Sequence, residues 1–195
     1  MPKPVFLILA AGGSTRLGRP KQLLRLKGET LVARAVRVVE EAGAIPVVVL
    51  GAREEDVRRQ IGSALWVVNP DWQAGMATSI LAGLDFLDVK FPGAPVGIAL
   101  TDQPAIGATH LSALVEAISE VDIACTHYPT GPGVPAIFAP NALSLLREVE
   151  GDRGAREILR QELHLNRYTM KVFENWDTLD IDEQDEWDKF LGSNE

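Results

Sequence analysis

The sequence predicts a three-layer α/β/α fold with a mainly parallel sheet, and two observations carry this prediction. Apolar runs rich in β-branched residues alternate with segments of helical periodicity along most of the 195 residues. Such alternation implies crossover connections whose helices cover both faces of a parallel sheet. Hydrophobic residues make up 46% of the chain and charged residues 24%, a globular composition at the length of one domain. We therefore expect residues 1–195 to form a single domain.

The expected elements follow one another in a regular order. The first part of the chain is expected to alternate strands at 5–10, 45–50, 65–68, 96–100 and 122–126 with helices at 30–42, 53–61, 76–87 and 109–120. Thr30 is a suitable helix N-cap, and Gly43 is a suitable stop for the same helix. Residues 128–135 are rich in proline and glycine and are expected to be an irregular loop. The remainder is expected to form a strand at 135–138, helices near 141–148 and 154–162, a strand near 168–173 and a closing helix near 183–191.

A run of small residues follows the first expected strand. It reads Leu9-Ala10-Ala11-Gly12-Gly13, and the cations Arg16 and Lys21 come after it. Small residues let backbone N–H groups close around a phosphate, and the two cations add charge. Gly13 and Gly18 have the spacing of a Walker loop, but Arg19-Pro20-Lys21 follows them, and the dinucleotide fingerprint is absent as well. The sequence therefore predicts a triphosphate-binding loop of another kind.

Further motifs follow in a fixed order along the chain. They are Trp72-x-x-Gly75-x-x-x-Ser79-x-x-x-Gly83, Leu100-Thr101-Asp102-Gln103-Pro104, Gly151-Asp152-Arg153-Gly154-Ala155-Arg156 and Asp180-Ile181-Asp182. With the glycine-rich run, they resemble the signatures of the MobA-like nucleotidyltransferases, and within that family most of all the molybdenum cofactor cytidylyltransferases. The resemblance implies a Rossmann-like fold of the nucleotide-diphospho-sugar-transferase type. It also implies transfer of CMP from CTP to the terminal phosphate of molybdopterin or the molybdenum cofactor, with release of pyrophosphate.

The same resemblance, together with the residue types, assigns roles to particular side chains. The expected catalytic residues are Arg16, Lys21 and Asp102. The expected nucleotide-binding residues are Leu9, Ala10, Ala11, Gly12, Gly13, Lys21, Gly75, Ser79 and Asp102. The acceptor is expected to bind at Gly133, Pro135, Asp152, Arg153 and Arg156. Because two polyanions repel one another, a bridging Mg²⁺ is expected, with Asp102, Asp180 and Asp182 as its candidate ligands.

Several readings of the function remain open at this point. Cytidine is preferred only because Ala10-Ala11 stands where the guanylyl branch tends to carry Ala-Gly. The alternatives are a GTP-dependent molybdopterin guanylyltransferase and a nucleotidyltransferase acting on a sugar or polyol phosphate. An alternative of another class is a non-catalytic nucleotide- or cofactor-binding chaperone that serves a molybdoenzyme client. Val134 stands where many relatives carry histidine, which leaves the acceptor open.

Charge and composition argue against other classes of partner. The formal net charge is −8, and one basic cluster after the first strand is the only concentration of positive charge in the sequence. A nucleic-acid partner would need an extended basic stripe, so none is expected. No apolar run is long enough to predict a membrane span, and no signal-like segment opens the chain, so a cytoplasmic protein is expected. The single cysteine, Cys125, is expected to be a buried strand thiol.

Overall fold

The fold is built on one seven-stranded sheet. The computed structural model describes residues 1–14, 19–174, 176, 179–181 and 184–192. The strand order across the sheet is β5 (Leu65–Val68), β4 (Ile45–Leu50), β1 (Val5–Leu9), β6 (Val96–Leu100), β8 (Gly131–Phe138), β7 (Ile123–Tyr128) and β9 (Met170–Phe173). Among these described strands, β8 alone runs antiparallel to its neighbours, β6 and β7. The expected mainly parallel sheet is confirmed.

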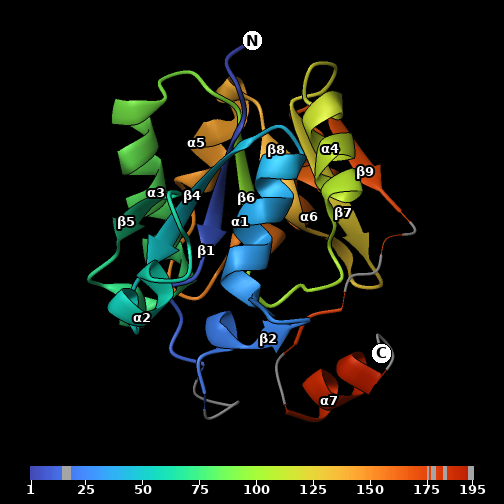
Figure 1. The fold of residues 1–195 in the computed structure, drawn as a ribbon. Helices are drawn as coiled ribbons and strands as arrows, with labels where there is room; N and C mark the ends of the chain where they lie inside the picture. Colours follow the sequence, from blue (N-terminus) through green and yellow to red (C-terminus); the bar gives the residue numbers. More distant parts are fainter. Residues whose placement is uncertain (15–18, 175, 177–178, 182–183, 193–195) are drawn as a thin grey trace.

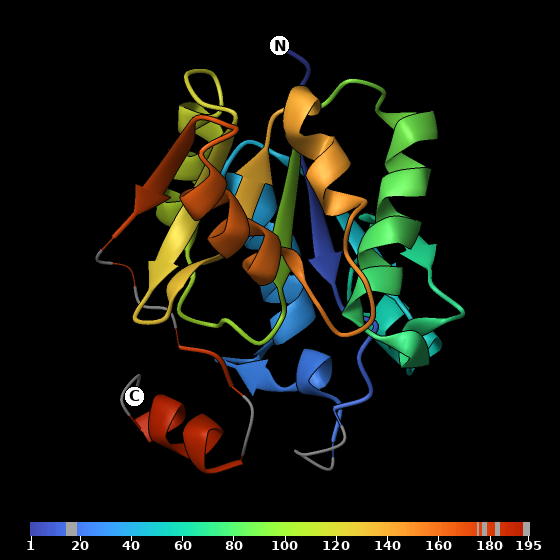
Figure 2. The ribbon, with the colours of Figure 1, turned by 180° about the vertical axis from the view of Figure 1, so that it is seen from behind.

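Helices cover both faces of this sheet. One face carries α1 (Leu31–Glu41), α2 (Glu54–Arg58) and α4 (Ala108–Ala117), while the other carries α3 (Met76–Lys90), α5 (Leu143–Leu146) and α6 (Ala155–Leu165). Figures 1 and 2 show the two helical layers from opposite sides. The three-layer α/β/α architecture predicted from the alternating pattern is therefore confirmed.

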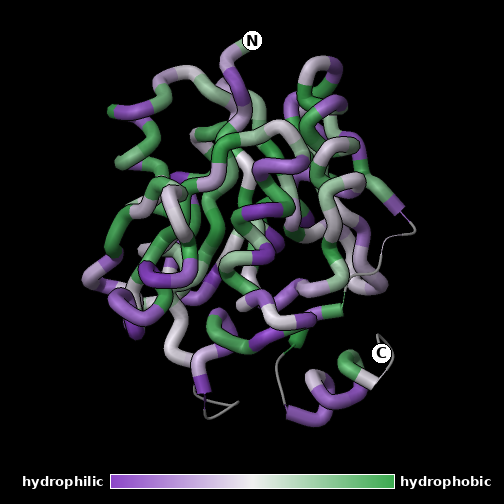
Figure 3. Tube along the Cα trace, viewed as in Figure 1, coloured by the Kyte–Doolittle hydropathy of each residue, from purple (hydrophilic) through white to green (hydrophobic). Residues whose placement is uncertain are grey.

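Local sequence signals explain why the elements form where they do. Residues 5–8 of β1 are fully buried because helices cover both faces, and such strands are continuous apolar runs. Figure 3 shows the hydrophobic colour concentrated along the central strands. The Thr30 side chain accepts a hydrogen bond from the Ala33 amide at 3.3 Å and caps α1. Gly43 has a φ of +79°, the left-handed conformation that ends this helix.

The segment 128–135 differs from its prediction. It is not an irregular loop, because β7 continues to Tyr128 and β8 begins at Gly131, so the two strands form a hairpin. The pairing register shifts between Cys125 and Thr126, where Val134 and Pro135 bulge out of the ladder. Proline lacks the N–H that a ladder needs, and a bulge accommodates it within a strand. Proline and glycine therefore indicated an irregularity here without excluding a strand.

Smaller elements close one end of the molecule. A short 3₁₀ turn, η1 (Lys21–Leu23), leads into a two-stranded ribbon of β2 (Arg25–Leu26) and β3 (Glu29–Thr30), which the sequence did not predict. The C-terminal helix α7 (Gln184–Gly192) lies beside this ribbon (Figure 1). A separate apolar cluster joins them, formed by Leu24, Leu31, Ile181, Trp187 and Phe190. The other 3₁₀ turns are η2 (Trp72–Ala74) and η3 (Pro140–Ala142).

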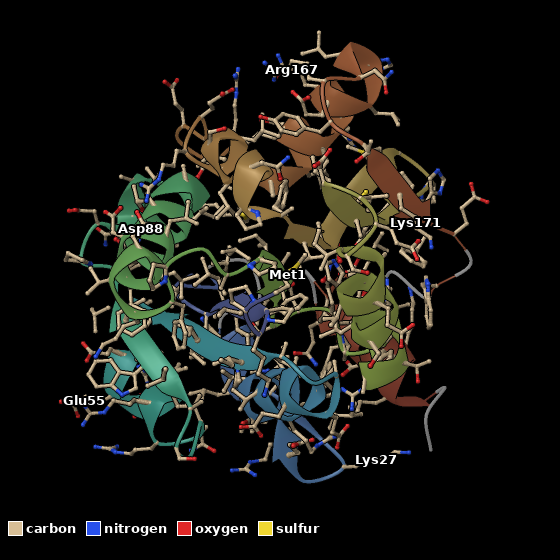
Figure 4. All side chains as sticks on the ribbon, turned by 90° about the horizontal axis from the view of Figure 1, so that it is seen from above. Met1, Lys27, Glu55, Asp88, Arg167 and Lys171 are labelled. Carbon is tan, nitrogen blue, oxygen red and sulfur yellow. The ribbon has the colours of Figure 1, made fainter. Side chains whose placement is uncertain are left out.

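Charged side chains are distributed over the outside of the molecule. Figure 4 shows Lys27, Glu55, Asp88, Arg167 and Lys171 on the periphery, each on a different segment of the ribbon. Among the described residues, no helix has the length and hydropathy needed to cross a bilayer. Cys125 is fully buried, and burial raises the pKa of its thiol to about 12, as expected for a packed strand residue.

One histidine is part of the core. His110 is fully buried and stacks on Trp176, with the ring centroids 4.3 Å apart. The Thr126 hydroxyl donates to the Pro135 carbonyl at 2.8 Å, so it accepts from the His110 Nε2–H at 2.9 Å. Burial lowers the pKa of His110 to about 4. His110 is therefore a neutral packing residue.

Replacing His110 is expected to change how stability depends on pH. In the unfolded chain His110 binds a proton below pH 6.5, whereas in the folded chain it does so only near pH 4, so stability is lost as the pH falls between these values. The full effect is on the order of 3 kcal/mol. His110→Gln retains a donor to Thr126 and does not titrate, so its free energy of unfolding, from urea denaturation, should fall less than that of the wild type between pH 6.5 and 4. Parallel curves for the two proteins would contradict this assignment.

Candidate functional site

The winding of the chain reverses at β1. This strand pairs in parallel with β4 on one side and with β6 on the other, so the loops that follow β1 and β6 leave the same edge of the sheet. Ligands bind at such a reversal in open α/β sheets, outside the carboxyl ends of the strands. A cavity of about 750 Å³ lies here. Its walls come from the glycine-rich loop, the end of β6, the start of α3 and the first turns of α6.

The glycine-rich loop is held by a side chain that the sequence analysis did not single out. Gln22 is buried, and its Nε2 donates to the Ala10 carbonyl at 2.8 Å and to the Gly12 carbonyl at 2.7 Å. The Lys21 amide donates to the Ser14 hydroxyl at 2.9 Å, and Ser14 has a φ of +51°. The loop is thus fixed from beneath, with Gly12 and Gly13 exposed. The signal was present in the sequence as a polar residue directly after the expected phosphate cation.

Lys21 and Asp102 meet in this cavity. Lys21 opens η1, and Asp102 follows the end of β6. The Lys21 Nζ lies 3.6 Å from the Asp102 Oδ2, and their side chains are 13% and 25% exposed. The expected pair of a phosphate-binding cation and a metal-binding carboxylate is therefore brought together by residues far apart in sequence.

Asp180 reaches the same cavity from the C-terminal segment. The neighbouring Ile181 is fully buried, and its amide donates to the Asp102 carbonyl oxygen at 2.8 Å. This bond places Asp180 beside the end of β6. The Asp180 Oδ1 accepts from the Gln103 Nε2 at 2.9 Å, and the Oδ2 accepts from the Arg156 Nη2 at 3.2 Å. The carboxylate of Asp180 is therefore oriented by a donor on each oxygen.

Gln103 connects this carboxylate to the β7–β8 hairpin. Its side chain is buried, and its Nε2 also lies 3.0 Å from the Val134 carbonyl and next to the Tyr128 hydroxyl. The Tyr128 hydroxyl itself donates to the Val134 carbonyl. Burial, and then the charge of Asp180, raise the pKa of Tyr128 above its ordinary value, so the phenol stays protonated as a donor. The side-chain amide of Gln103 thus connects the end of β6 with the β7–β8 hairpin and with the C-terminal segment at Asp180.

The nucleotide-binding residues expected from the sequence fall into two groups. Leu9, Ala11, Gly12, Gly13, Lys21, Gly75, Ser79 and Asp102 all line the cavity. Ala10 does not line it, because its side chain is buried in the core and its carbonyl is held by Gln22. Ser79 is buried and accepts from the Nδ2 of Asn69, the residue after β5, at 2.9 Å, so this bond fixes its position.

Gly75 joins two of the sequence motifs by direct contact. It has a φ of +114°, and a Cβ there would lie 2.3 Å from the carbonyl oxygen of Gly151. The Ala77 amide donates to that same oxygen at 3.0 Å. The start of α3 and the turn before α6 therefore pack backbone to backbone, which a glycine at position 75 allows.

The acceptor residues expected from the sequence are only partly brought together. Asp152 and Arg156 line the cavity, and the Arg156 guanidinium lies 4.7 Å from the centre of the Tyr128 ring. Arg153 does not line it: its side chain is 75% exposed and pairs with Glu157 at 3.5 Å.

Two further expected acceptor residues lie on the β7–β8 hairpin. Gly133 and Pro135 do not line the cavity either, and Val134 between them does. A Cβ at Gly133 would meet the Tyr128 ring and the Arg156 guanidinium, so these two groups cover Gly133. The carbonyl of Pro135 instead accepts from Thr126, and Gly133 lies beneath the Tyr128 ring. Arg160, which the sequence analysis missed, lines the cavity one helical turn after Arg156.

Two expected site residues lie outside the described part of the chain. Arg16 and Asp182 belong to segments that the structure does not describe, so their expected roles in triphosphate and metal binding stay predictions. Within the described residues, no group of three or more His, Cys, Asp or Glu side chains is placed to hold a metal ion. The carboxylates of Asp102 and Asp180 both lie at the end of β6, and both line the cavity.

A glycine-rich loop, the Lys21–Asp102 pair and the first turns of α6 thus surround one cavity at the reversal point of an α/β sheet, which is where such folds bind ligands. The MobA-like NTP transferase domain matches residues 6–166 of the chain. This protein therefore belongs to the MobA-like nucleotidyltransferase family.

Proteins named for different activities are similar to this chain. The chain is 34% identical to nicotine blue oxidoreductase of Paenarthrobacter nicotinovorans, over 83% of this chain and 84% of that protein. It is 35% identical to a probable molybdenum cofactor guanylyltransferase of Opitutus terrae, over 78% of this chain and 74% of that protein. The crystal structure of Rv0371c from Mycobacterium tuberculosis H37Rv in complex with manganese superposes with a TM-score of 0.78 at 25% identity, covering 98% and 99% of the two chains. These names differ in activity, so they identify the family and leave the substrate open.

Replacing Gln103 by glutamate is expected to destabilise the protein in a pH-dependent way. Glutamate would place a second carboxylate beside Asp180 and remove the donor that Asp180 and the Val134 carbonyl share. At pH 7 the free energy of unfolding should fall by on the order of 3 kcal/mol. The folded-state pKa of the new carboxyl is raised by Asp180, so the loss should shrink as the pH falls toward 5.

The matched control for this variant is Gln161→Glu, at an exposed position on α6. Urea denaturation of both variants and the wild type at pH 7 and pH 5 measures the difference. A Gln103→Glu protein as stable as the Gln161→Glu protein at pH 7 would rule out the joining role of Gln103.

Proposed function

We propose that this MobA-like nucleotidyltransferase transfers CMP from CTP to the terminal phosphate of molybdopterin or of the molybdenum cofactor. The observation that carries the proposal is the meeting of Lys21 and Asp102, 3.6 Å apart, at the reversal point of the sheet and inside one cavity of about 750 Å³. A site that only binds a nucleotide does not need a phosphate cation set against an acidic side chain. The pair therefore favours catalysis over the chaperone alternative.

The reaction needs positioning and charge neutralisation more than proton transfer. An oxygen of the acceptor phosphate forms a bond to the α-phosphorus of CTP, and the bond from that phosphorus to the bridging oxygen breaks. The electron pair leaves with pyrophosphate. The second pKa of a phosphate monoester is about 6, so the nucleophile is mostly dianionic at neutral pH and needs no general base. Lys21 is placed to neutralise charge on the triphosphate, while the glycine-rich loop donates backbone N–H groups.

The residues present fit a magnesium ion. Mg²⁺ prefers oxygen ligands and is usually held by one or two carboxylates together with substrate phosphates. Asp102 and Asp180 both line the cavity and are tied together by the bond from the Ile181 amide to the Asp102 carbonyl. When bound, the ion supplies charge neutralisation between the two polyanions. The manganese complex of the mycobacterial relative supports a divalent cation in this fold.

The choice of base rests on the glycine-rich loop. Ala11 lines the cavity, and it stands where the guanylyl branch tends to carry glycine. This supports CTP. The likeness to a probable guanylyltransferase makes GTP the second candidate nucleotide. The assay that tests the activity therefore also compares the two nucleotides.

Nucleotide preference is read from pyrophosphate release. The protein is incubated with Mg²⁺ and molybdopterin and offered CTP or GTP at equal concentration. CTP should give the larger kcat/KM, because the loop carries Ala11 in the place of glycine. A larger kcat/KM for GTP would replace cytidine by guanosine in the proposal, and tight CTP binding without pyrophosphate release would favour the non-catalytic chaperone.

Removing the Lys21 ammonium is expected to depress turnover severely. Loss of one group that stabilises charge in a transition state lowers kcat by about 10²–10³-fold. Lys21→Ala should show this loss with an unchanged circular dichroism spectrum, while Lys90→Ala, at the C-terminal end of α3, serves as the control with normal turnover. Comparable turnover in the two variants would remove Lys21 from the mechanism.

A further inference from the structure

Two arginines of α6 form one wall of the cavity. Arg156 and Arg160 are four residues apart, so they lie one above the other on the same face of the helix. Both lie over β8, where glycines leave room for them. A Cβ at Gly133 would lie 3.4 Å from the Arg156 Nε, and a Cβ at Gly131 would lie 3.7 Å from the Arg160 Nε. The wall therefore holds two guanidinium groups side by side, with a glycine beneath each.

The charges on this wall are not balanced within the described chain. Arg156 pairs with Asp180 at 3.2 Å. Glu157 also lines the cavity, but it pairs with Arg153 at 3.5 Å. Arg160 makes no ion pair with any described residue, and its Nε is buried without a hydrogen-bond partner among them. Among the described residues, no acidic side chain thus pairs with the positive charge of Arg160, which lines the cavity.

A buried N–H group without a hydrogen-bond acceptor destabilises the protein unless a bound ligand supplies that acceptor. Leaving a buried N–H unpaired costs about 1–3 kcal/mol, and more for a charged group. Arginine presents five N–H donors in a rigid fork that matches the oxygens of a phosphate. A phosphate group would therefore supply the acceptor oxygens that the arginine N–H groups of this wall need.

We propose that Arg160 and Arg156 together bind the phosphate monoester of the acceptor. This inference rests on the proposed function, since it assigns the acceptor end of the same cavity. Arg156 also contacts Asp180, which links the two-arginine wall to the carboxylates at the end of β6. Arg160 takes the role that the sequence analysis gave to Arg153, because a residue one turn into α6 faces the cavity while Arg153 faces solvent.

Titration with inorganic phosphate tests this subsite without turnover. The Lys21→Ala protein is used as the background, because phosphate can also bind at the glycine-rich loop and this change weakens that site. Isothermal titration calorimetry should show saturable phosphate binding that Arg160→Gln weakens by about tenfold or more, as expected for the loss of a charge-assisted hydrogen bond. Arg160→Lys, which keeps the charge and loses the fork, should give an intermediate affinity. The matched control is Arg147→Gln, since Arg147 pairs with Asp85 and Asp88 on the surface.

The outcomes separate this inference from the proposed function. Equal phosphate affinity in the background protein with and without Arg160→Gln would overturn the subsite, even if the wild-type protein transfers CMP. A second result is phosphate binding that depends on Arg160 while the wild-type protein releases pyrophosphate from neither CTP nor GTP. That result would uphold the subsite and reject the proposed function. In the transfer assay, Arg160→Gln in an otherwise wild-type chain should raise the KM for the acceptor about tenfold and leave the KM for CTP unchanged. A rise in the KM for CTP alone would also overturn the assignment.

Discussion

The parallel pairing of β1 with β6 is the constraint on which the rest of the site depends. Leu9 and Leu100 are partners in that pairing, so the glycine-rich loop and the Asp102 turn leave the sheet side by side. Parallel strands need crossover connections. The direction in which these connections step across the sheet changes at β1, because β4 lies on one side of it and β6 on the other. Lys21 and Asp102 meet because both follow strands that end at this one reversal. The contact between them is therefore a product of topology.

Buried side-chain amides hold the loop segments whose positions are not set by the strand order. Gln22 holds the carbonyls of the glycine-rich loop, and Gln103 holds Asp180 beside the β7–β8 hairpin. Asn69 does the same for Ser79 at the start of α3. A buried amide that satisfies several partners rigidifies its surroundings, because each lost bond would leave a polar atom without water. The glycine-rich loop, the end of β6 and the start of α3 are thus each held by a buried amide.

An acidic protein can still bind anions when its cations converge. The formal charge is −8, yet Lys21, Arg156 and Arg160 line one cavity. Charges on the surface are separated by water and salt, whereas cations in a cleft with low-dielectric walls act together on a ligand. The antiparallel strand β8 contributes by placing glycines beneath the arginines. Net charge therefore said little about the binding site, and the expectation that no nucleic acid binds stays a prediction.

Local patterns in the sequence determined the alternating elements, the three-layer class and the Thr30 cap, because these depend on periodicity and on neighbouring residues. Ordered motifs also brought Lys21, Asp102, Asp180 and Arg156 into consideration. Only the tertiary structure decided that β8 is a bulged strand, that Arg160 rather than Arg153 faces the cavity, and that Ala10 supports the loop from the core. The physical reason is that the direction of a side chain depends on strand register and helix rotation, which are set by packing against segments distant in the chain.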